Sequence, residues 1–302
     1  MNVFICNTPF QFYYTQLILR EYSHIQEQHF IISTFQNKSE VLKDLPNLNI
    51  IPRDIIQIIK LIIKIKKVQK EKNVNIYIPH IDGIILNTFY QIFFKTKNVE
   101  FNIYYEGIAL FRPSNFKIKQ SSKKIIFKLL LSLFTCFRTK GIFYLNPIGL
   151  SSNSNVFSPI PIKSQGNTYI VELPKFKKGS ILPHHAVIFL SPYDNLEVLE
   201  QVLNKVQMIS KLESSKIYIK PHFNTSIDFN YLEKFKILDP SSIGETIIEE
   251  SNFQWIFFTH FSSLILNLNL KGIDSNRIFL HTEATIPDLI IGDLEKPFFN
   301  KF

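Results

Sequence analysis

Short β-branched runs alternate with longer helical runs along most of the chain, and this alternation constrains the fold more than any other feature. A strand, a helix and a second strand in succession are typical of a parallel sheet covered by helices. Thr8 and Pro9 predict the start of the first helix, as its N-cap and its first residue. The elements expected in this half are strands at Val3–Cys6, His29–Ser33, Asn75–Ile78 and Val99–Tyr105, and helices at Phe10–Tyr22 and Ile84–Lys95.

The alternation breaks between about Asn146 and His185, where prolines stand among Ser and Asn residues. This segment contains one expected strand, Thr168–Glu172, and is interpreted as a connection between domains. The elements expected after it are strands at Ala186–Leu190, Lys216–Lys220, Phe235–Leu238, Phe253–Phe258 and Arg277–Leu280, and helices at Asn195–Leu212, Gly244–Glu250 and Ser262–Leu270. For a chain of 302 residues, we expect two Rossmann-like α/β domains facing across a central cleft, residues 1–160 and 161–302.

A formal net charge of +9 and a pI near 9.3 favour an anionic partner, although lysine-rich surfaces also serve solubility alone. Two basic amphipathic stretches, Asp54–Lys70 and Lys117–Lys140, concentrate this charge. Each is compatible with a helix in a membrane interface and with a core-packed helix that has a solvated basic face. Core packing is favoured for the first stretch, and contact with an anionic membrane for the second, whose centre is apolar nearly all round. In the first stretch, one helical face carries Ile55, Ile58, Ile59, Ile62 and Ile65, and the other carries Lys60, Lys64 and Lys67.

Several classes of protein do not fit the sequence. Cys6 and Cys136 each stand in an apolar run, so neither a disulfide framework nor a cysteine metal site is expected. No apolar run reaches about 18 residues, and Met1–Cys6 has no leader-like features, so we expect a cytoplasmic protein without a transmembrane helix. The chain lacks the Gly-rich nucleotide loops and the zinc-protease and hydrolase motifs. It also has no Asp-x-Asp pair to hold a metal-bound nucleotide, so no metal and no cofactor are expected.

Three short polar motifs each follow an expected strand. The first is Tyr104-Tyr105-Glu106-Gly107. A carboxylate at the carboxyl end of a strand faces the crevice where α/β proteins bind ligands. Glu106 is therefore a candidate general base for a hydroxyl substrate. The alternative is a turn or helix cap without chemistry.

The second motif is Lys220-Pro221-His222, after the expected strand Lys216–Lys220. Proline fixes the backbone at the strand end and places His222 at the crevice edge. Imidazole can protonate or hydrogen-bond a departing phosphate near neutral pH, and Lys220 adds positive charge. The alternative is a structural or surface histidine.

The third motif runs from Thr259 and His260 to Ser262 and Ser263, where a helix is expected to begin. Hydroxyls and free N–H groups at a helix N-terminus can bind phosphate, but a plain serine N-cap gives the same pattern. Glu245 is a weaker candidate, as a ribose-binding carboxylate or as a first-turn glutamate favoured by the helix dipole.

Together, the acid-Gly motif, the His motif with its proline and the paired serines resemble the bacterial sialyltransferases of the GT-B fold. Glycosyltransferase family 52 and the capsule polysialyltransferases are the groups most similar in motif. Phe4–Gln11 is similar to the first strand and turn of family 52. Two positions depart from the pattern. Tyr105 stands where those enzymes usually carry a first carboxylate, and Phe223 stands where a proline follows the histidine.

The resemblance implies an inverting, metal-independent transfer of sialic acid from CMP-sialic acid to a glycan hydroxyl. Glu106 would deprotonate the acceptor, and His222 would stabilise the leaving phosphate. The first domain would then be the acceptor side and the second the nucleotide-binding side. Donor binding would involve the residues Asn7, Thr8, Gln11, Gly107, Lys220, Pro221, Glu245, Thr259, His260, Ser262 and Ser263.

The implied partners are a sugar nucleotide and a glycan acceptor of lipooligosaccharide or capsule type, at the inner face of the cell membrane. Lys117–Lys140, and to a lesser degree Asp54–Lys70, would contact that membrane. One alternative is a GT-B transferase with another donor, CMP-Kdo or a UDP-sugar. A second is a non-catalytic basic protein that binds membrane or nucleic acid, but the aromatic-basic motifs of common RNA modules are missing.

Overall fold

The computed structural model describes the chain in two compact units. The units are Met1–Glu106 with Arg112–Glu172, and Gly107–Phe111 with Leu173–Phe302. The described residues are 1–22, 27–33, 47–81, 83–94, 96–107, 117–118, 143–144, 154–161, 166–175, 184–190, 196–222, 234–240, 244, 254–259, 264–273, 277–280 and 300–301.

The first unit is built on a seven-stranded sheet in the order β3-β2-β1-β4-β5-β8-β9, and every neighbouring pair is parallel. The chain moves outward from β1 on one side and then crosses to β4 on the other. The carboxyl ends of β1 and β4 therefore form a topological switch point. The strands are β1 Asn2–Ile5, β2 His29–Ile32, β3 Leu48–Ile51, β4 Val74–Ile78, β5 Val99–Tyr104, β8 Val156–Ser158 and β9 Thr168–Ile170. A separate antiparallel pair is formed by β6 Lys117–Ile118 and β7 Phe143–Tyr144.

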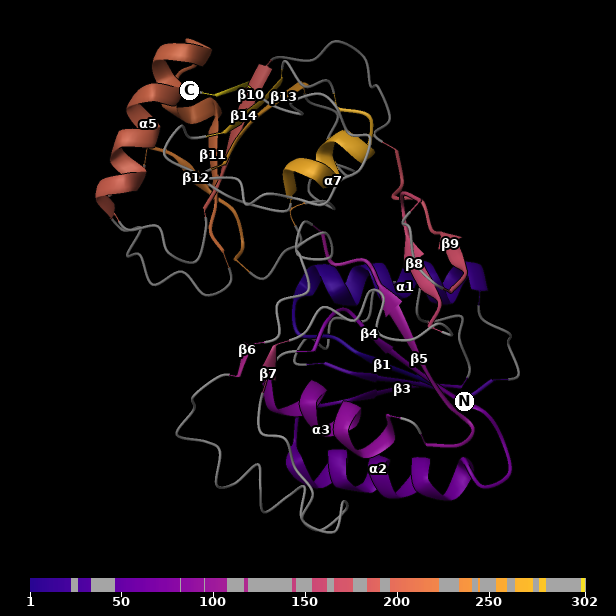
Figure 1. Cartoon of the computed structure of the whole chain (residues 1–302). Coiled ribbons are helices and arrows are strands. Elements are labelled where there is room, and N and C mark those ends of the chain that lie inside the picture. Colours follow the sequence, from indigo (N-terminus) through magenta and orange to yellow (C-terminus); the bar gives the residue numbers. More distant parts are fainter. Residues whose placement is uncertain are drawn as a thin grey trace. The chain divides into compact units, whose positions relative to one another are not determined.

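Helix α1 (Pro9–Tyr22) covers one face of this sheet, and α2 (Ile55–Val68) and α3 (Gly83–Phe93) cover the other (Figure 1). Successive side chains of β1 pack on opposite faces of the sheet. Val3 and Ile5 belong to the core under α2 and α3, whereas Phe4 stacks on Tyr77 with ring centroids 4.2 Å apart. The first helix begins as expected, because the Gln11 N–H donates to Thr8 Oγ1.

Helix α2 packs one side against the sheet, which confirms core packing for the Asp54–Lys70 stretch, whereas contact of its basic side with a membrane stays a prediction. Asp54 caps it by accepting from the N–H groups of Ile56 and Gln57. The expected face needs one correction, because Ile55 is 46% exposed. Ile55 lies in the first turn and at the margin of the face that meets the sheet. The residues that are buried on α2 are Ile58, Leu61, Ile62 and Ile65.

The second unit is built on a six-stranded parallel sheet in the order β12-β11-β10-β13-β14-β15. Its first strand, β10, is central, as β1 is in the other unit. The strands are β10 His184–Phe189, β11 Ile217–Lys220, β12 Lys236–Ile237, β13 Gln254–Thr259, β14 Ile278–Leu280 and β15 Asn300–Lys301. The described helices are α5 Leu196–Ser210 and α7 Leu264–Leu270, with a 3-10 turn at Ser214–Lys216.

The α/β class and the two Rossmann-like units are confirmed. Five strands lay outside the expected set: β3, β6, β7, β8 and β15. The first unit extends to Glu172, because β8 and β9 continue its sheet beside β5. Of the expected helix Gly244–Glu250, only Gly244 is described, and of Lys117–Lys140 only the strand β6. Among the described residues, no helix combines the length and hydrophobicity needed to cross a membrane.

Candidate functional site

Three neighbouring strands of the first unit end at one edge of its sheet, and each is followed by a polar residue that contributes to one cluster. Asn7 and Thr8 follow β1, His80 follows β4, and Glu106 follows β5. This edge includes the switch point between β1 and β4, where open α/β sheets bind ligands.

The centre of the cluster is the Glu106 carboxylate, whose side chain is only 6% exposed. Its Oε2 accepts a 2.9 Å hydrogen bond from Gln11 Nε2 and lies 2.6 Å from His80 Nδ1. The contact with His80 is one of charge and distance, because the ring is not aligned for a directed hydrogen bond. Within the described residues, Glu106 Oε1 is buried and has no hydrogen-bond partner. One carboxylate oxygen is therefore held, and the other lacks a hydrogen-bond donor among the described residues.

Gln11 is oriented by the turn before α1. Its side-chain oxygen accepts a 2.6 Å hydrogen bond from the Asn7 backbone N–H, so its NH2 group must point the other way, toward Glu106. Gln11 is almost fully buried. Asn7 Oδ1 is also buried, without a hydrogen-bond partner in the described part of the chain. The structure thus brings Asn7, Thr8 and Gln11 to the candidate base, and their contact with a donor sugar stays a prediction.

The residues on either side of Glu106 serve the backbone and the core. Tyr105 is fully buried and meets the rings of Phe10 and Tyr14 edge-on, at 5.9 Å and 5.4 Å between centroids. The aromatic side chain at this position is therefore part of the packing between β5 and α1. Gly107 has φ of 96°, a conformation that residues with a Cβ rarely adopt. Glu106 is therefore the candidate for chemistry in this motif, and its role as a base stays a prediction.

His80 was not among the candidates from sequence. The available signal was a repeated pattern: Ile76-Tyr77-Ile78-Pro79-His80 resembles the segment that ends in Pro221-His222. In both, a strand runs into a proline and then a histidine. The pattern predicts a histidine at the carboxyl edge of each sheet, and the structure places His80 there against Glu106.

In the second unit, Lys220, Phe189 and Thr259 stand in register across β11, β10 and β13. Lys220 is buried, and its Nζ donates to the backbone oxygens of Pro221 at 2.7 Å and Pro240 at 3.1 Å. These hydrogen bonds tie the segment that leads to His222 to the segment after β12. A structural role for Lys220 is thus visible, and its role toward a nucleotide stays a prediction.

His222 is half-buried two residues after β11, and Thr259 ends β13 in the core. Thr259 Oγ1 is buried and has no hydrogen-bond partner among the described residues. Gly244 lies so near the end of β10 that a Cβ there would be 2.8 Å from the Phe189 ring. Four predicted site residues lie outside the described residues: Glu245, His260, Ser262 and Ser263.

The described residues contain no group of three or more His, Cys, Asp or Glu side chains that could hold a metal ion. Metal independence of the chemistry stays a prediction.

Solved structures with a similar fold include an α/β-galactoside α-2,3-sialyltransferase from the luminous marine bacterium Photobacterium phosphoreum. It superimposes with a TM-score of 0.57 and 15% identity, over 96% of this chain and 92% of the other. A sialyltransferase from Photobacterium damsela gives a TM-score of 0.50 and 13% identity, over 95% of this chain and 75% of the other. Neither a protein-family model nor a curated protein sequence matches the chain. At these identities, the likeness establishes the fold: the chain has the two-unit α/β GT-B fold of these sialyltransferases.

Proposed function

We propose that this chain is an inverting glycosyltransferase that moves sialic acid from CMP-sialic acid to a hydroxyl of a glycan acceptor. The observation that carries the proposal is the Glu106 carboxylate, which is buried at a switch-point edge with Oε2 held and Oε1 without a partner. A general base needs this combination, because one oxygen must be positioned and the other must accept a proton. The fold shared with solved sialyltransferases supports the donor class.

In the proposed reaction, the acceptor hydroxyl donates its hydrogen bond to Glu106 Oε1. The acceptor oxygen attacks the anomeric carbon of sialic acid while its proton passes to Glu106. The bond from that carbon to the phosphate oxygen breaks on the opposite face, and CMP leaves with the electron pair. Gln11 and His80 keep Oε2 in place, so Oε1 points at the acceptor throughout.

The leaving phosphate is assigned to the second unit. His222 would donate to the phosphate, with Ser262, Ser263, Thr259 and His260 close by in sequence. Glu245 would accept from the ribose hydroxyls. Hydroxyl, imidazole and amide donors can neutralise this charge without a metal ion. Lys220 would act indirectly, by fixing the segment that carries His222.

The acceptor class we propose is a lipid-linked glycan of lipooligosaccharide or capsule type at the inner membrane face. The order of the three motifs along the chain supports similarity to glycosyltransferase family 52. The Glu106 side chain is only 6% exposed, so an acceptor hydroxyl would meet it in a site with little water. A water-poor setting strengthens the hydrogen bond to Oε1.

The test is a nucleotide-release assay with CMP-sialic acid, CMP-Kdo and several UDP-sugars, each with and without a panel of galactoside acceptors. We expect acceptor-dependent CMP release from CMP-sialic acid. Glu106→Gln should lower the rate of transfer by roughly 100-fold or more. His222→Ala should lower the rate of transfer and also the rate at which the donor is hydrolysed without an acceptor. Glu100→Gln is the matched control, an exposed carboxylate on β5, the strand that Glu106 follows. Release of UMP or UDP but not CMP would overturn the donor assignment.

A further inference from the structure

The outward side of α2 carries a single line of alternating isoleucine and lysine side chains. The residues in this line, called here the Ile-Lys stripe, are Ile56, Lys60, Ile63 and Lys67 on the helix and Lys70 in the turn that follows it. The four helical residues recur every three or four positions, so they lie one above another. All are exposed, and the stripe lies opposite the buried side of α2 that contacts the sheet.

Ordinary surface requirements explain only part of this stripe. Lys67 lies in the last helical turn, where a cation interacts favourably with the helix dipole. That reason does not extend to Lys60, in the middle of the helix. Nor does it explain Ile56 and Ile63, which are 58% and 56% exposed. A solvated helix face normally carries polar side chains at such positions. Exposed aliphatic groups between cations match the composition of helices that lie in a membrane interface.

The lysines of the stripe are available for a partner. Among the described residues, Lys60, Lys67 and Lys70 have no acidic side chain within ion-pair distance. Lys64, at the side of the stripe, lies over the Phe30 ring at 4.4 Å. Between Ile56 and Lys70, the sequence contains five lysines and no acidic residue.

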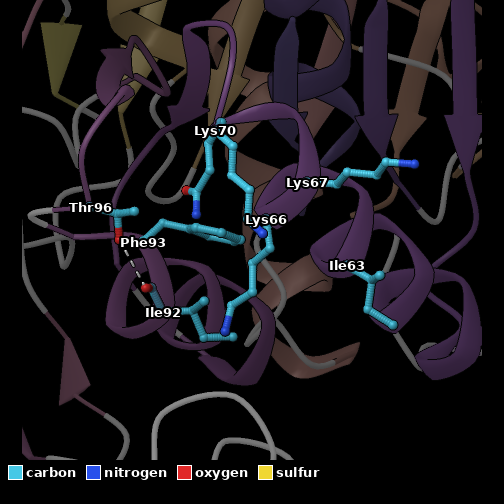
Figure 2. A pocket seen from close by; sticks show the side chains of 8 residues that line it. Ile63, Lys66, Lys67, Lys70, Ile92, Phe93 and Thr96 are labelled. Atoms are coloured by element: carbon cyan, nitrogen blue, oxygen red, sulfur yellow. Dashed lines mark hydrogen bonds between the residues drawn. The ribbon is translucent and has the colours of Figure 1, made fainter.

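A groove of about 510 Å³ adjoins the end of the stripe, between α2 and the end of α3. Ile63, Lys66 and Lys70 line it on one side, and Ile92 and Phe93 on the other. Figure 2 shows Lys66 extending toward Ile92 and Lys67 pointing away from the groove. The groove thus combines an apolar wall with ammonium groups. The ammonium groups match a lipid headgroup phosphate, and the apolar wall matches the first methylenes of the lipid.

We propose that the Ile-Lys stripe docks this unit on an anionic phospholipid bilayer. The lysines lie at the level of the lipid phosphates, Ile56 and Ile63 enter the interface, and the groove receives one headgroup phosphate. Amphipathic helices bind membranes through this division of apolar and cationic groups. A phosphate backbone of nucleic acid would leave the isoleucines without an apolar contact, and the stripe has no aromatic side chain to stack on bases. A second copy of the chain in a two-fold contact would set lysine against lysine.

The experiment is co-sedimentation of the full chain with phosphatidylcholine vesicles, with and without about 30% phosphatidylglycerol. We expect binding to the anionic vesicles alone, weakening as salt rises. Each lysine near such a surface contributes roughly fivefold to affinity, so Lys60→Gln, Lys67→Gln and Lys70→Gln together should weaken binding about 100-fold. The matched control removes three exposed lysines of the second unit, Lys175, Lys211 and Lys234, by the same change to Gln.

A second variant, Ile56→Ser with Ile63→Ser, keeps the charge and tests insertion. It should bind at low salt but lose the binding that wild type retains at high salt. Equal weakening in the control variant would overturn the proposal, because net charge alone would then explain binding. Equal binding to neutral vesicles, tighter binding to a duplex oligonucleotide, or reversible dimerisation abolished by the stripe variants would also overturn it. Circular dichroism and transfer to a soluble acceptor should be unchanged in every variant, so the outcome is independent of the proposed chemistry.

Discussion

The side-chain amide of Gln11 donates a 2.9 Å hydrogen bond to Glu106 Oε2, although 95 positions separate the two residues. The same amide accepts from the Asn7 N–H, so the turn after β1 determines where the carboxylate at the end of β5 points. The position of the proposed base therefore depends on residues that follow two different strands, β1 and β5.

Replacing Gln11 by Leu should lower kcat about 10-fold and leave the KM for the donor nearly unchanged. The change removes one hydrogen bond to a charged group, which contributes roughly 1.5–3 kcal/mol, in a buried site of similar volume. Steady-state kinetics with a soluble acceptor would measure it. Gln207→Leu is the control, since Gln207 makes a hydrogen bond of the same 2.9 Å length to Ser214 in the second unit. A change in the KM for the donor with kcat unchanged would argue against a role of Gln11 in positioning Glu106.

Replacing His80 by Asn should lower kcat by roughly 10-fold or more and leave the KM for the donor nearly unchanged. His80 Nδ1 lies 2.6 Å from Glu106 Oε2, so the imidazole helps to fix one oxygen of the proposed base. Steady-state kinetics with a soluble acceptor would measure the change. His184→Asn, at an exposed position of β10, is the control and should leave kcat unchanged. A wild-type kcat in the His80 variant would mean that this contact does not position Glu106.

Cys6 should resist thiol reagents in the folded protein. Burial raises the pKa of its thiol to about 11, and Sγ lies 3.3 Å from Thr15 Oγ1 in the core. A Cys136→Ser variant leaves Cys6 as the single cysteine. At pH 8 its labelling by a disulfide reagent should be at least about 100-fold slower in buffer than in urea, since only the thiolate reacts.

The same burial predicts a stability change at high pH. The unfolded thiol has a pKa near 9.0 and the folded one near 11, so deprotonation favours the unfolded state. The free energy of unfolding should therefore decline as pH rises from about 9 toward 11. Cys6→Ala should flatten part of that decline in urea titrations. Rapid stoichiometric labelling of native Cys6 would contradict both expectations.

Gly166→Ala should destabilise the first unit. A Cβ at Gly166 would clash with the Ser154 backbone oxygen, so the chain between β8 and β9 would have to move. Overpacking of this kind costs roughly 1–3 kcal/mol. Differential scanning calorimetry of the variant and the wild type would measure the loss. An unchanged midpoint would show that the chain near Ser154 moves at little cost.

Tyr105, which departs from the expected acid motif, illustrates what could not be predicted from the sequence. The residues predicted a strand that ends in a carboxylate, and β5 ends there. They did not show that Tyr105 would pack against Phe10 and Tyr14 on α1, because that contact depends on how the helix crosses the sheet. The repeated strand-Pro-His pattern could have placed His80 at a sheet edge, but its contact with Glu106 depends on β4 lying beside β5.

The sequence by itself determined the local elements and the faces of the helices, because strand and helix periodicities are properties of consecutive residues. It placed Glu106 and His222 at strand ends and gave α2 a buried and a basic side. Only the tertiary structure decided the strand order, and with it the meeting of Asn7, Gln11, His80 and Glu106 at one edge. It also decided which isoleucines of α2 stay exposed, since burial depends on where the sheet beneath the helix ends. Contacts between distant segments arise from packing the whole core, and no short window of residues contains that information.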